Sequence, residues 1–303
     1  MKRLPTLLLL LAALVPYASA QTHIDNDADE VVRYWDNSTA PHSNEESEAE
    51  QLNAKGHFSH ISETVFYLYK AEPTKATGRA VVIFPGGGYM KVCMRNEGFG
   101  VARWFKEQGI TAMVVKYRLP NRGHKEVPLE DALAALRYLR EHAEALGIDP
   151  TRVGVCGSSA GGHLAAYVAN FAEESERPAF AVLFYPASSG RTWQTAKNTF
   201  PYLLGKERTP AEQEYYSLEN RVSEATPPTI LLLCDDDRTV PPINSIDYYS
   251  ALKRHGVRAE MHIYPSGGHG WAGKASFRYA ENWKRDTARW IAELDEADGT
   301  NTK

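Results

Sequence analysis

Short apolar runs recur along the chain from residue 64 onwards, and segments with helical periodicity lie between them. Most runs are continuous rather than alternating, which is typical of strands buried on both faces of a sheet. Strands that alternate with helices predict right-handed crossovers, so we expect an α/β fold with a mostly parallel central sheet flanked by helices. The predicted strands cover residues 64–69, 80–84, 111–117, 152–156, 180–185, 229–234 and 260–264, and the predicted helices cover 98–108, 129–146, 160–172, 245–255 and 277–294.

Residues 21–60 precede this rhythm and differ from it in composition. They are polar and acidic, and their charge is densest over residues 44–50. We expect a surface-bound or partly mobile N-terminal extension, followed by one domain over residues 61–298.

Residues 187–228 form the longest interruption between two predicted strands. A segment of that length within a compact domain indicates a functional insertion, here a cap of short helices over the site. Its aromatic side chains could stack on a sugar, but packing of the insertion onto the domain is the favoured interpretation. These side chains belong to Trp193, Phe200, Tyr202, Tyr215 and Tyr216.

The first 20 residues have the organisation of a cleavable export signal. Lys2 and Arg3 precede an apolar stretch over residues 7–15, and Ala18-Ser19-Ala20 provides small side chains for cleavage before Gln21. The apolar stretch is shorter than the about 20 residues that a membrane-spanning helix needs. We therefore expect a secreted or periplasmic protein that is not bound to a membrane after cleavage, and no lipid anchor, because residue 21 is not a cysteine.

Composition narrows the classes of partner. The chain has 303 residues and a formal net charge of −4, which becomes −6 when Lys2 and Arg3 are removed. Without a cluster of basic residues, we expect no nucleic-acid partner. The three cysteines, Cys93, Cys156 and Cys234, are an odd number without close pairing, and no Cys/His spacing resembles a zinc site. We expect no metal, no cofactor and no disulfide framework.

Ser159 is the candidate nucleophile. It lies at the centre of Gly157-Ser158-Ser159-Ala160-Gly161, between a predicted strand and a predicted helix. A serine on such a tight turn is lifted above the sheet, and small residues two positions away on each side avoid clashes. The N-terminus of the following helix would favour a developing oxyanion. The other interpretation is a glycine-rich turn that packs a helix closely on a strand.

A serine needs a base, and an imidazole base needs a carboxylate that fixes its tautomer. Asp235-Asp236-Asp237 follows the predicted strand 229–234, and His269 lies between two glycines after the last predicted strand. The order serine, aspartate, histidine is that of the α/β-hydrolase fold. His269 is the predicted base and Asp237 the predicted acid, with Asp236 second, because the turn towards Val240 can release Asp237 from the strand.

A candidate oxyanion hole follows the predicted strand 80–84, in Pro85-Gly86-Gly87-Gly88-Tyr89. Pro85 has no amide hydrogen, so we expect Gly87 or Gly88 to act together with the amide of Ala160. No Lys-Ser/Thr pair follows these glycines, which argues against a phosphate-binding loop.

With these motifs placed, the chain resembles the α/β-hydrolase superfamily and, within it, the carbohydrate acetyl esterase branch that is often labelled acetyl xylan esterase-like. The resemblance covers about residues 65–290. Besides the segments above, it rests on Tyr117-Arg118-Leu119-Pro120, Pro128-Leu129-Glu130-Asp131, Gly162-His163-Leu164, Leu203-Leu204-Gly205, Thr226-Pro227-Pro228, Val240-Pro241-Pro242 and Asn244-Ser245.

The resemblance implies that Ser159, Asp237 and His269 are the catalytic residues. It implies hydrolysis of acetyl or other short acyl groups from sugars or plant polysaccharide, without a metal. The predicted partner is thus an acylated carbohydrate or another small ester. The alternatives are a general short-chain carboxylesterase or lipase of the same fold and a non-catalytic carbohydrate-binding relative.

Overall fold

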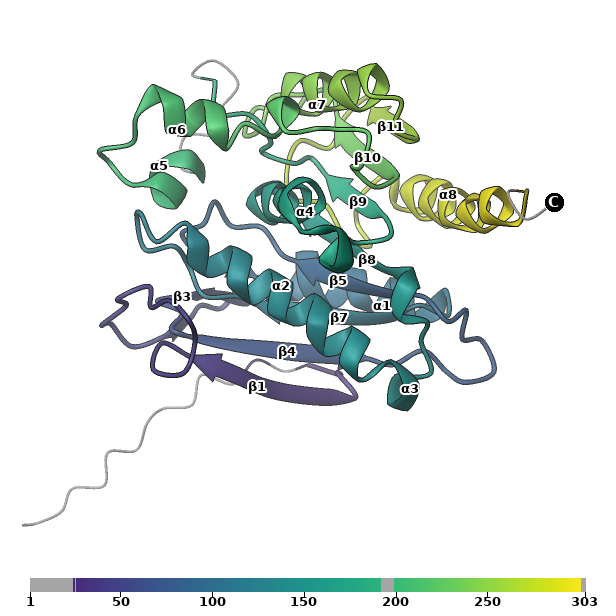
Figure 1. The fold of residues 1–303 in the computed structure, drawn as a ribbon, viewed down its shortest axis with the longest axis horizontal. Coiled ribbons are helices and arrows are strands. Elements are labelled where there is room, and N and C mark those ends of the chain that lie inside the picture. The colour runs from purple at the N-terminus through teal and green to yellow at the C-terminus, as the bar shows by residue number, and fades with distance from the viewer. Residues whose placement is uncertain (1–23, 25, 192–198, 301–303) are drawn as a thin grey trace, which may run out of the picture.

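The computed structural model describes residues 24, 26–191 and 199–300, with the side chains of 295–300 excepted (Figure 1). The predicted export signal and Trp193 lie outside the described residues. The described part is built around a twisted sheet of eight strands in the order β1-β4-β7-β5-β8-β9-β10-β11. The six strands from β7 to β11 in this order run parallel to one another. Strand β4 is antiparallel to both of its neighbours, β1 and β7.

All seven predicted strands are present, and their ends differ from the predicted ends by at most two residues. Every residue of the central strands β5, β7, β8, β9 and β10 is buried, as expected from their continuous apolar runs. The seven strands are β4 (Glu63–Tyr69), β5 (Ala80–Phe84), β7 (Thr111–Lys116), β8 (Val153–Ser158), β9 (Ala181–Phe184), β10 (Thr229–Cys234) and β11 (Ala259–Tyr264).

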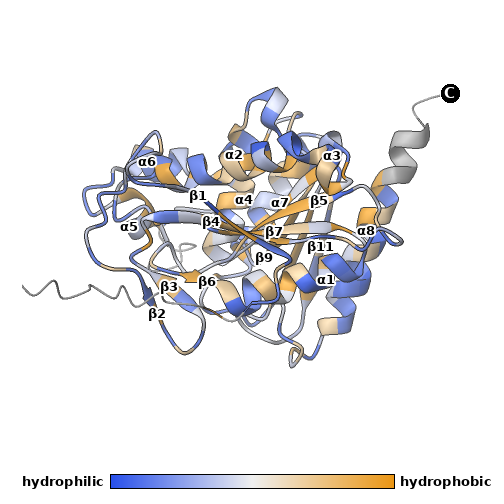
Figure 2. Cartoon of the chain, turned by 90° about the horizontal axis from the view of Figure 1, so that it is seen from below, coloured by the Kyte–Doolittle hydropathy of each residue, from blue (hydrophilic) through white to orange (hydrophobic). Residues whose placement is uncertain are grey.

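Helices cover both faces of the sheet, and their outer surfaces are hydrophilic (Figure 2). Helices α1 and α8 share one face, where Trp104 and Trp283 meet edge to face with ring centroids 4.8 Å apart. The other face is covered by α2, α4 and α7. The helices are α1 (Val101–Glu107), α2 (Glu126–Glu141), α3 (Ala143–Leu146), α4 (Ser159–Phe171), α7 (Ile243–Arg254) and α8 (Ala280–Thr300), with single 3₁₀ turns at Pro150–Arg152 and Glu174–Glu176.

Three predicted helices differ in detail: the helix predicted over 277–294 instead runs from Ala280 to Thr300. The helix predicted over 98–108 begins earlier, as a π-helical segment, η1 (Met94–Gly100), that continues directly into α1. The helix predicted over 129–146 starts at Glu126 and is divided at His142 into α2 and α3.

The N-terminal segment contributes a strand that the sequence analysis did not predict. Strand β1 (Glu30–Asp36) pairs antiparallel with β4 at the edge of the sheet. Arg118 and Asp131 form a buried ion pair that holds this segment in place. Trp35 Nε1 donates a hydrogen bond to Asp131 Oδ1 (2.7 Å), and Arg118 donates one to the carbonyl oxygen of His42. The predicted start of the domain at residue 61 is therefore corrected, because residues 30–36 form an edge strand of its main sheet.

A small second sheet joins the N-terminal segment to the loop after β5. It consists of β2 (Gln51–Leu52), β3 (His57–Ser59) and β6 (Val92–Cys93), in that order. Strand β3 pairs antiparallel with both neighbours, so residues 51–59 lie beside the segment that follows the glycine loop. This pairing brings Lys55 and His57 to the cavity described below.

The insertion between β9 and β10 contains α5 (Thr199–Leu204), α6 (Pro210–Tyr215) and a 3₁₀ turn, η4 (Leu218–Asn220). Its helices lie at the same end of the molecule as β3 (Figure 1). Phe200 and Tyr216 are buried, and the half-buried Tyr202 stacks under the guanidinium of Arg122. Packing is confirmed as the role of these three aromatic side chains, and Tyr215 is exposed against Arg221.

Candidate active site

Ser159 occupies the turn between β8 and α4. The strand ends at Ser158, the helix begins at Ser159, and the backbone of Ser159 has a positive φ of 54°. That conformation is strained for a residue with a side chain. A Cβ atom on Gly157 would lie 2.1 Å from the carbonyl oxygen of Gly161, and one on Gly161 would lie 2.0 Å from that of Phe84. The two glycines are therefore sterically required for this turn.

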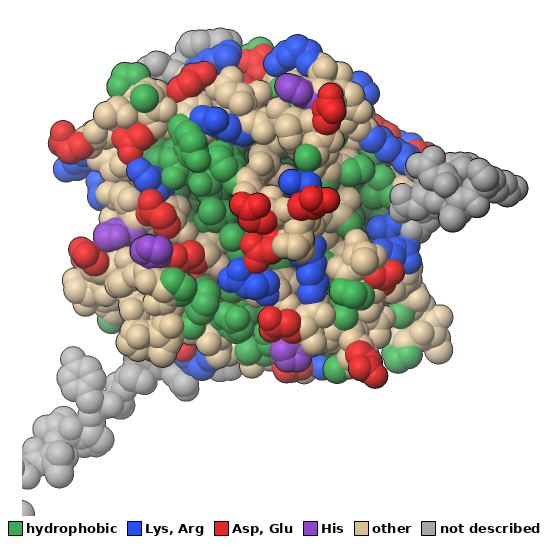
Figure 3. Space-filling view, in the orientation of Figure 1, with side chains coloured by type: hydrophobic (Ala, Val, Ile, Leu, Met, Phe, Trp, Pro, Cys, Tyr) green, Lys and Arg blue, Asp and Glu red, His purple; other side chains and the backbone are tan. Residues whose placement is uncertain are grey.

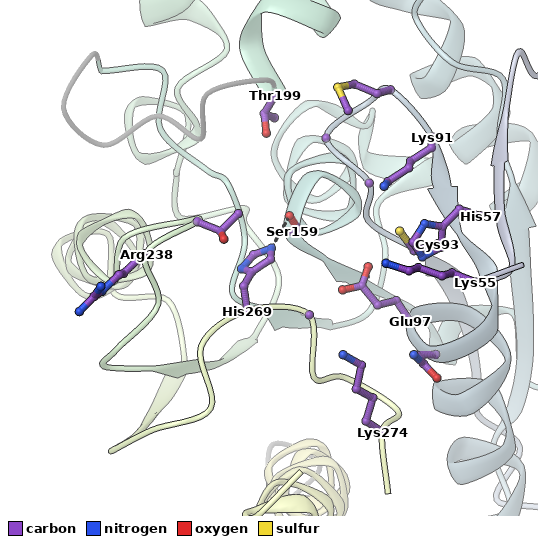
Figure 4. A pocket seen from close by; sticks show the side chains of 16 residues that line it. Lys55, His57, Lys91, Cys93, Glu97, Ser159, Thr199, Arg238, His269 and Lys274 are labelled. Atoms are coloured by element: carbon purple, nitrogen blue, oxygen red, sulfur yellow. Dashed lines mark hydrogen bonds between the residues drawn. The ribbon is translucent and has the colours of Figure 1, made fainter. Parts of the chain in front are cut away.

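Ser159, His269 and Asp237 form one chain of hydrogen bonds. His269 Nε2 lies 2.9 Å from Ser159 Oγ (Figure 4), and His269 Nδ1 lies 2.6 Å from Asp237 Oδ2. A carboxylate only accepts, so Nδ1 carries the proton of a neutral ring and Nε2 accepts the hydrogen bond from the Ser159 hydroxyl. The serine is thus hydrogen-bonded to an unprotonated imidazole nitrogen, the arrangement that a nucleophile and its base require.

The three consecutive aspartates have different positions. The side chain of Asp237 is inaccessible to solvent, and its Oδ1 accepts hydrogen bonds from the amides of Thr239 (2.8 Å) and Val240 (3.0 Å). Asp236 is exposed and instead accepts from the amides of Gly268 (2.8 Å) and Gly267 (3.2 Å), and these hydrogen bonds, chiefly that from Gly268, lower its pKa. Asp235 is exposed. Of the two candidates, Asp237 contacts the imidazole and Asp236 holds the loop that carries it.

The glycine loop after β5 lies opposite the serine. Gly87 and Gly88 line the same cavity as Ser159, and both have a positive φ, 139° and 66°. A Cβ atom on Gly87 would also lie 2.1 Å from the carbonyl oxygen of Lys91. Tyr117 anchors the loop by donating a hydrogen bond from its hydroxyl to the carbonyl oxygen of Pro85 (2.8 Å). The structure therefore places both predicted glycines in the wall of the cavity that Ser159 lines.

Glu97, in η1, is a buried carboxylate at the site that the sequence analysis missed. Its Oε2 accepts a hydrogen bond from the amide of Gly86 (2.9 Å), and its Oε1 accepts one from the hydroxyl of Tyr185 (2.9 Å). The same hydroxyl accepts a hydrogen bond from the amide of Ala272 (2.9 Å), and the ring of Tyr185 lies 4.5 Å from that of His269. Burial raises the pKa of Glu97, and the hydrogen bonds from Tyr185 and Gly86 oppose that rise. Glu97 thus connects the glycine loop with the histidine loop.

His163, in the first turns of α4, connects the glycine loop with the insertion. Its Nδ1 lies 3.0 Å from the hydroxyl of Tyr89, and its Nε2 lies 2.9 Å from the carbonyl oxygen of Tyr216. Burial lowers the pKa of His163 to about 4, so the ring is neutral at pH 7. Because a carbonyl oxygen only accepts, Nε2 carries the proton and Nδ1 accepts from Tyr89. No sequence signal beyond its place in the quoted motif indicated this contact.

The cavity in front of Ser159 has a volume of about 600 Å³. Its walls come from the β2–β3 segment, the glycine loop, η1, the insertion at Thr199 and the loops that carry Thr239 and His269. Of the predicted insertion aromatics, none of the four described ones lines it. The volume is in the range of sites that hold a small organic ligand.

Other kinds of site are not indicated within the described part of the chain. No group of three or more histidine, cysteine, aspartate or glutamate side chains there could hold a metal ion. Cys156 and Cys234 are buried and unpaired, and Cys93 is half-buried and unpaired. Within residues 24–300, apart from the two gaps, no helix has both the length and the apolar character needed to cross a membrane.

This fold and the strand-turn-helix that carries Ser159 define an α/β hydrolase. The α/β-hydrolase fold family matches residues 81–273, and the chain belongs to that family. Among solved structures, an acetyl ester-xyloside bifunctional hydrolase from Caldicellulosiruptor lactoaceticus is similar at a TM-score of 0.72 and 31% identity, over 89% of this chain and 98% of that one. The resemblance that the sequence motifs predicted is confirmed.

Two of the similar curated proteins have names that refer to xylan. The acetylxylan esterase of Xylanibacter ruminicola is 37% identical over 73% of this chain and 47% of its own length. The endo-1,4-β-xylanase B of Butyrivibrio fibrisolvens is 30% identical over 73% of this chain and 36% of its own length. The chain thus spans less than half of these two relatives. An ethyl acetate hydrolase of Pseudomonas putida is 25% identical over 79% of this chain and 81% of its own.

Proposed function

We propose that this protein is a serine ester hydrolase that removes acetyl or other short acyl groups from sugars or plant polysaccharide. The observation that carries the proposal is the chain of hydrogen bonds from Ser159 through His269 to Asp237. The names of two similar proteins, an acetylxylan esterase and an acetyl ester-xyloside hydrolase, support the substrate class.

In the acylation step, Ser159 Oγ attacks the carbonyl carbon of the ester while His269 Nε2 takes the serine proton. Asp237 keeps the ring in the required tautomer and stabilises the imidazolium that forms. The carbonyl oxygen becomes an oxyanion, which accepts hydrogen bonds from the amide of Ala160 and from that of Gly87 or Gly88. A single such donor contributes about 10²–10³-fold in kcat in enzymes of this type.

The bond to the alcohol then breaks, and the imidazolium of His269 protonates the leaving sugar oxygen. The product of this half-reaction is an acetyl or short acyl ester of Ser159. Water repeats the sequence on that ester: His269 takes a proton from water, the hydroxide attacks, and the serine leaves with the proton returned by His269. The residues named here complete both half-reactions.

The first experiment compares wild type with Ser159→Ala on 4-nitrophenyl acetate, butyrate and octanoate and on acetylated xylan. We expect acetate release from xylan and a preference for the acetyl ester, both lost in the variant. A preference for octanoate would favour a lipase. Hydrolysis of the small esters without release of acetate from xylan would favour a general short-chain carboxylesterase, an alternative that the name of the ethyl acetate hydrolase supports. Carbohydrate binding without any turnover would identify a non-catalytic relative and overturn the proposal.

We also propose that the protein acts outside the cytoplasm, after removal of residues 1–20. The basis is the charged, apolar and small-residue organisation of that segment. Edman sequencing of the protein recovered from the medium or periplasm should begin at Gln21. Recovery of the intact chain from the cytoplasm alone would contradict this.

A further inference from the structure

The cavity at Ser159 is lined by cationic side chains. Lys55, Lys91, Lys274 and Arg238 belong to its wall, whereas Glu97 is the one carboxylate among the described lining residues. The chain as a whole is mildly acidic, with a net charge of −4, and the face in Figure 3 shows acidic and basic side chains interspersed. The excess of positive charge is thus a local property of the cavity.

Three of these cations come from segments far apart in the chain and lie on one side of the cavity. Lys55 lies in the turn between β2 and β3, Lys91 directly precedes β6, and Lys274 follows the loop of His269. Figure 4 shows their side chains around the space next to Glu97, with Arg238 across from them beyond His269. Lys55 and Lys274 are exposed and Lys91 is half-buried, so a ligand in the cavity can reach all three.

Within the described part of the chain, the three lysines also lack carboxylate partners. Within the described residues, no acidic oxygen lies within 4.0 Å of the ammonium groups of Lys55, Lys91 and Lys274, whereas Lys106, Lys116 and Lys125 each form an ion pair. The two oxygens of Glu97 are already occupied by the amide of Gly86 and the hydroxyl of Tyr185. No described protein group therefore neutralises this side of the cavity by direct contact.

The lysines also affect the pKa values of the neighbouring His57 and Cys93. Burial lowers the pKa of His57, and Lys91, then Lys55, lower it further, with Lys274 contributing as well. Burial raises the pKa of the Cys93 thiol to about 12, so Cys93 is uncharged at pH 7, although Lys91 and Lys274 oppose the rise. His57 and Cys93 therefore add no negative charge that would offset the lysines.

We propose that the cavity selects acylated saccharides that carry a carboxylate, that is, chains with uronic acid units, and that Lys55, Lys91 and Lys274 hold this carboxylate. The inference rests on the proposed function. It assigns the carboxylate to the sugar side of the ester, because an acetyl group fills only a small part of a cavity of about 600 Å³. The exposed Lys55 and Lys274 lie where the leaving sugar and its neighbours extend towards solvent. Ion pairs of exposed lysines are individually weak, so the proposal requires the three to act together.

The first test uses a matched pair of substrates, acetylated xylo-oligosaccharides of equal length with and without a glucuronic acid branch. We expect wild-type kcat/KM to be about tenfold higher for the acidic substrate at low ionic strength, equivalent to about 1.4 kcal/mol. The preference should shrink as NaCl is added, because salt screens exposed charges. Equal kcat/KM values would overturn the inference but leave the proposed function intact, whereas failure to deacetylate either oligosaccharide would defeat the proposed function.

The second test assigns the preference to the lysines. In the triple variant Lys55→Gln/Lys91→Gln/Lys274→Gln, the ratio of acidic to neutral kcat/KM should fall to about one. The matched control is Lys253→Gln, an exposed lysine on α7 that does not line the cavity and should leave the ratio as in wild type. A triple variant that keeps the wild-type ratio and melting temperature would overturn the assignment. If the triple variant is unstable, the salt dependence of the wild-type preference still shows whether charged side chains produce it.

The third test separates the sugar side from the acyl side. 4-Nitrophenyl hemisuccinate carries its carboxylate on the acyl group, and 4-nitrophenyl butyrate is its neutral counterpart of equal chain length. We expect wild type to show no preference for the hemisuccinate. A lysine-dependent preference for it, without one for the glucuronic acid branch, would place the carboxylate on the acyl side and overturn the proposal as stated.

Discussion

Asp236 Oδ1 accepts a hydrogen bond of 2.8 Å from the backbone amide of Gly268, the residue before His269. The adjacent Asp237 reaches the imidazole itself, at 2.6 Å from Nδ1. Two consecutive carboxylates thus support one histidine in different ways: one holds the backbone of its loop and the other binds its ring.

This difference predicts unequal effects of two like substitutions. Asp237→Asn should lower kcat by about a thousandfold or more, because an amide can donate to Nδ1 and so favours the wrong tautomer. Asp236→Asn retains an acceptor for one glycine amide and should lower kcat by less than about tenfold. Steady-state kinetics on 4-nitrophenyl acetate measure both. Near-wild-type activity of Asp237→Asn would transfer the role of the acid to Asp236.

Glu97 predicts a second pair of variants. Glu97→Ala leaves the Gly86 amide and the Tyr185 hydroxyl without their acceptor. If the glycine loop stabilises the oxyanion as proposed, this variant should lower kcat by about tenfold or more, with a smaller effect on KM. Glu97→Gln retains an oxygen for Gly86 and should recover most of the kcat. Equal losses in both variants would show that the charge of Glu97, and not its hydrogen bond to the loop, is what matters.

His163 predicts a pH dependence of stability. The folded protein holds its pKa at about 4, below the usual value of 6.5. The unfolded chain therefore binds more protons as the pH falls, so the contribution of neutral His163 is present above pH 6.5 and is lost as the pH falls towards about 4. The expected loss from this residue is on the order of 3 kcal/mol.

Urea unfolding of wild type and His163→Gln between neutral pH and pH 4 tests this. Glutamine keeps a donor for the carbonyl oxygen of Tyr216 but does not titrate in this range. The variant should be less stable than wild type at neutral pH and should lose less stability on acidification. Parallel pH profiles of the two proteins would contradict the assignment of a neutral, buried imidazole.

Gly157 predicts a steric effect confined to the serine turn. In Gly157→Ala, the new Cβ atom lies 2.1 Å from the carbonyl oxygen of Gly161, so the turn must shift and kcat should fall by about a hundredfold. The control is Gly256→Ala after α7, where φ is 71° and no atom lies within 4 Å of the new Cβ. That change should cost about 1 kcal/mol of stability and leave kcat unchanged. If Gly157→Ala is fully active, the turn is less crowded than described.

The fold was largely predictable because its signals are local. A strand buried on both faces needs an unbroken apolar run, and a helix packed on a sheet needs apolar residues at helical spacing. Each element can therefore be recognised from its own residues. Strand β1 was missed because it lies at an edge, where half-buried positions alternate with exposed ones and Val31 remains 49% exposed. The apolar pattern did not indicate the division at His142 or the π-helical start at Met94.

The sequence by itself determined the local chemistry of the site: a serine between small residues, glycines that permit the turns, and an aspartate and a histidine after the right strands. Only the tertiary structure decided that Asp237 rather than Asp236 reaches His269, that Glu97 joins two loops, and that Lys55, Lys91 and Lys274 meet at one cavity. The physical reason is distance along the chain. Local patterns reflect interactions between residues a few positions apart, whereas these contacts depend on how the main sheet, which contains β5 and β10, and the small sheet, which contains β3, are arranged in the fold.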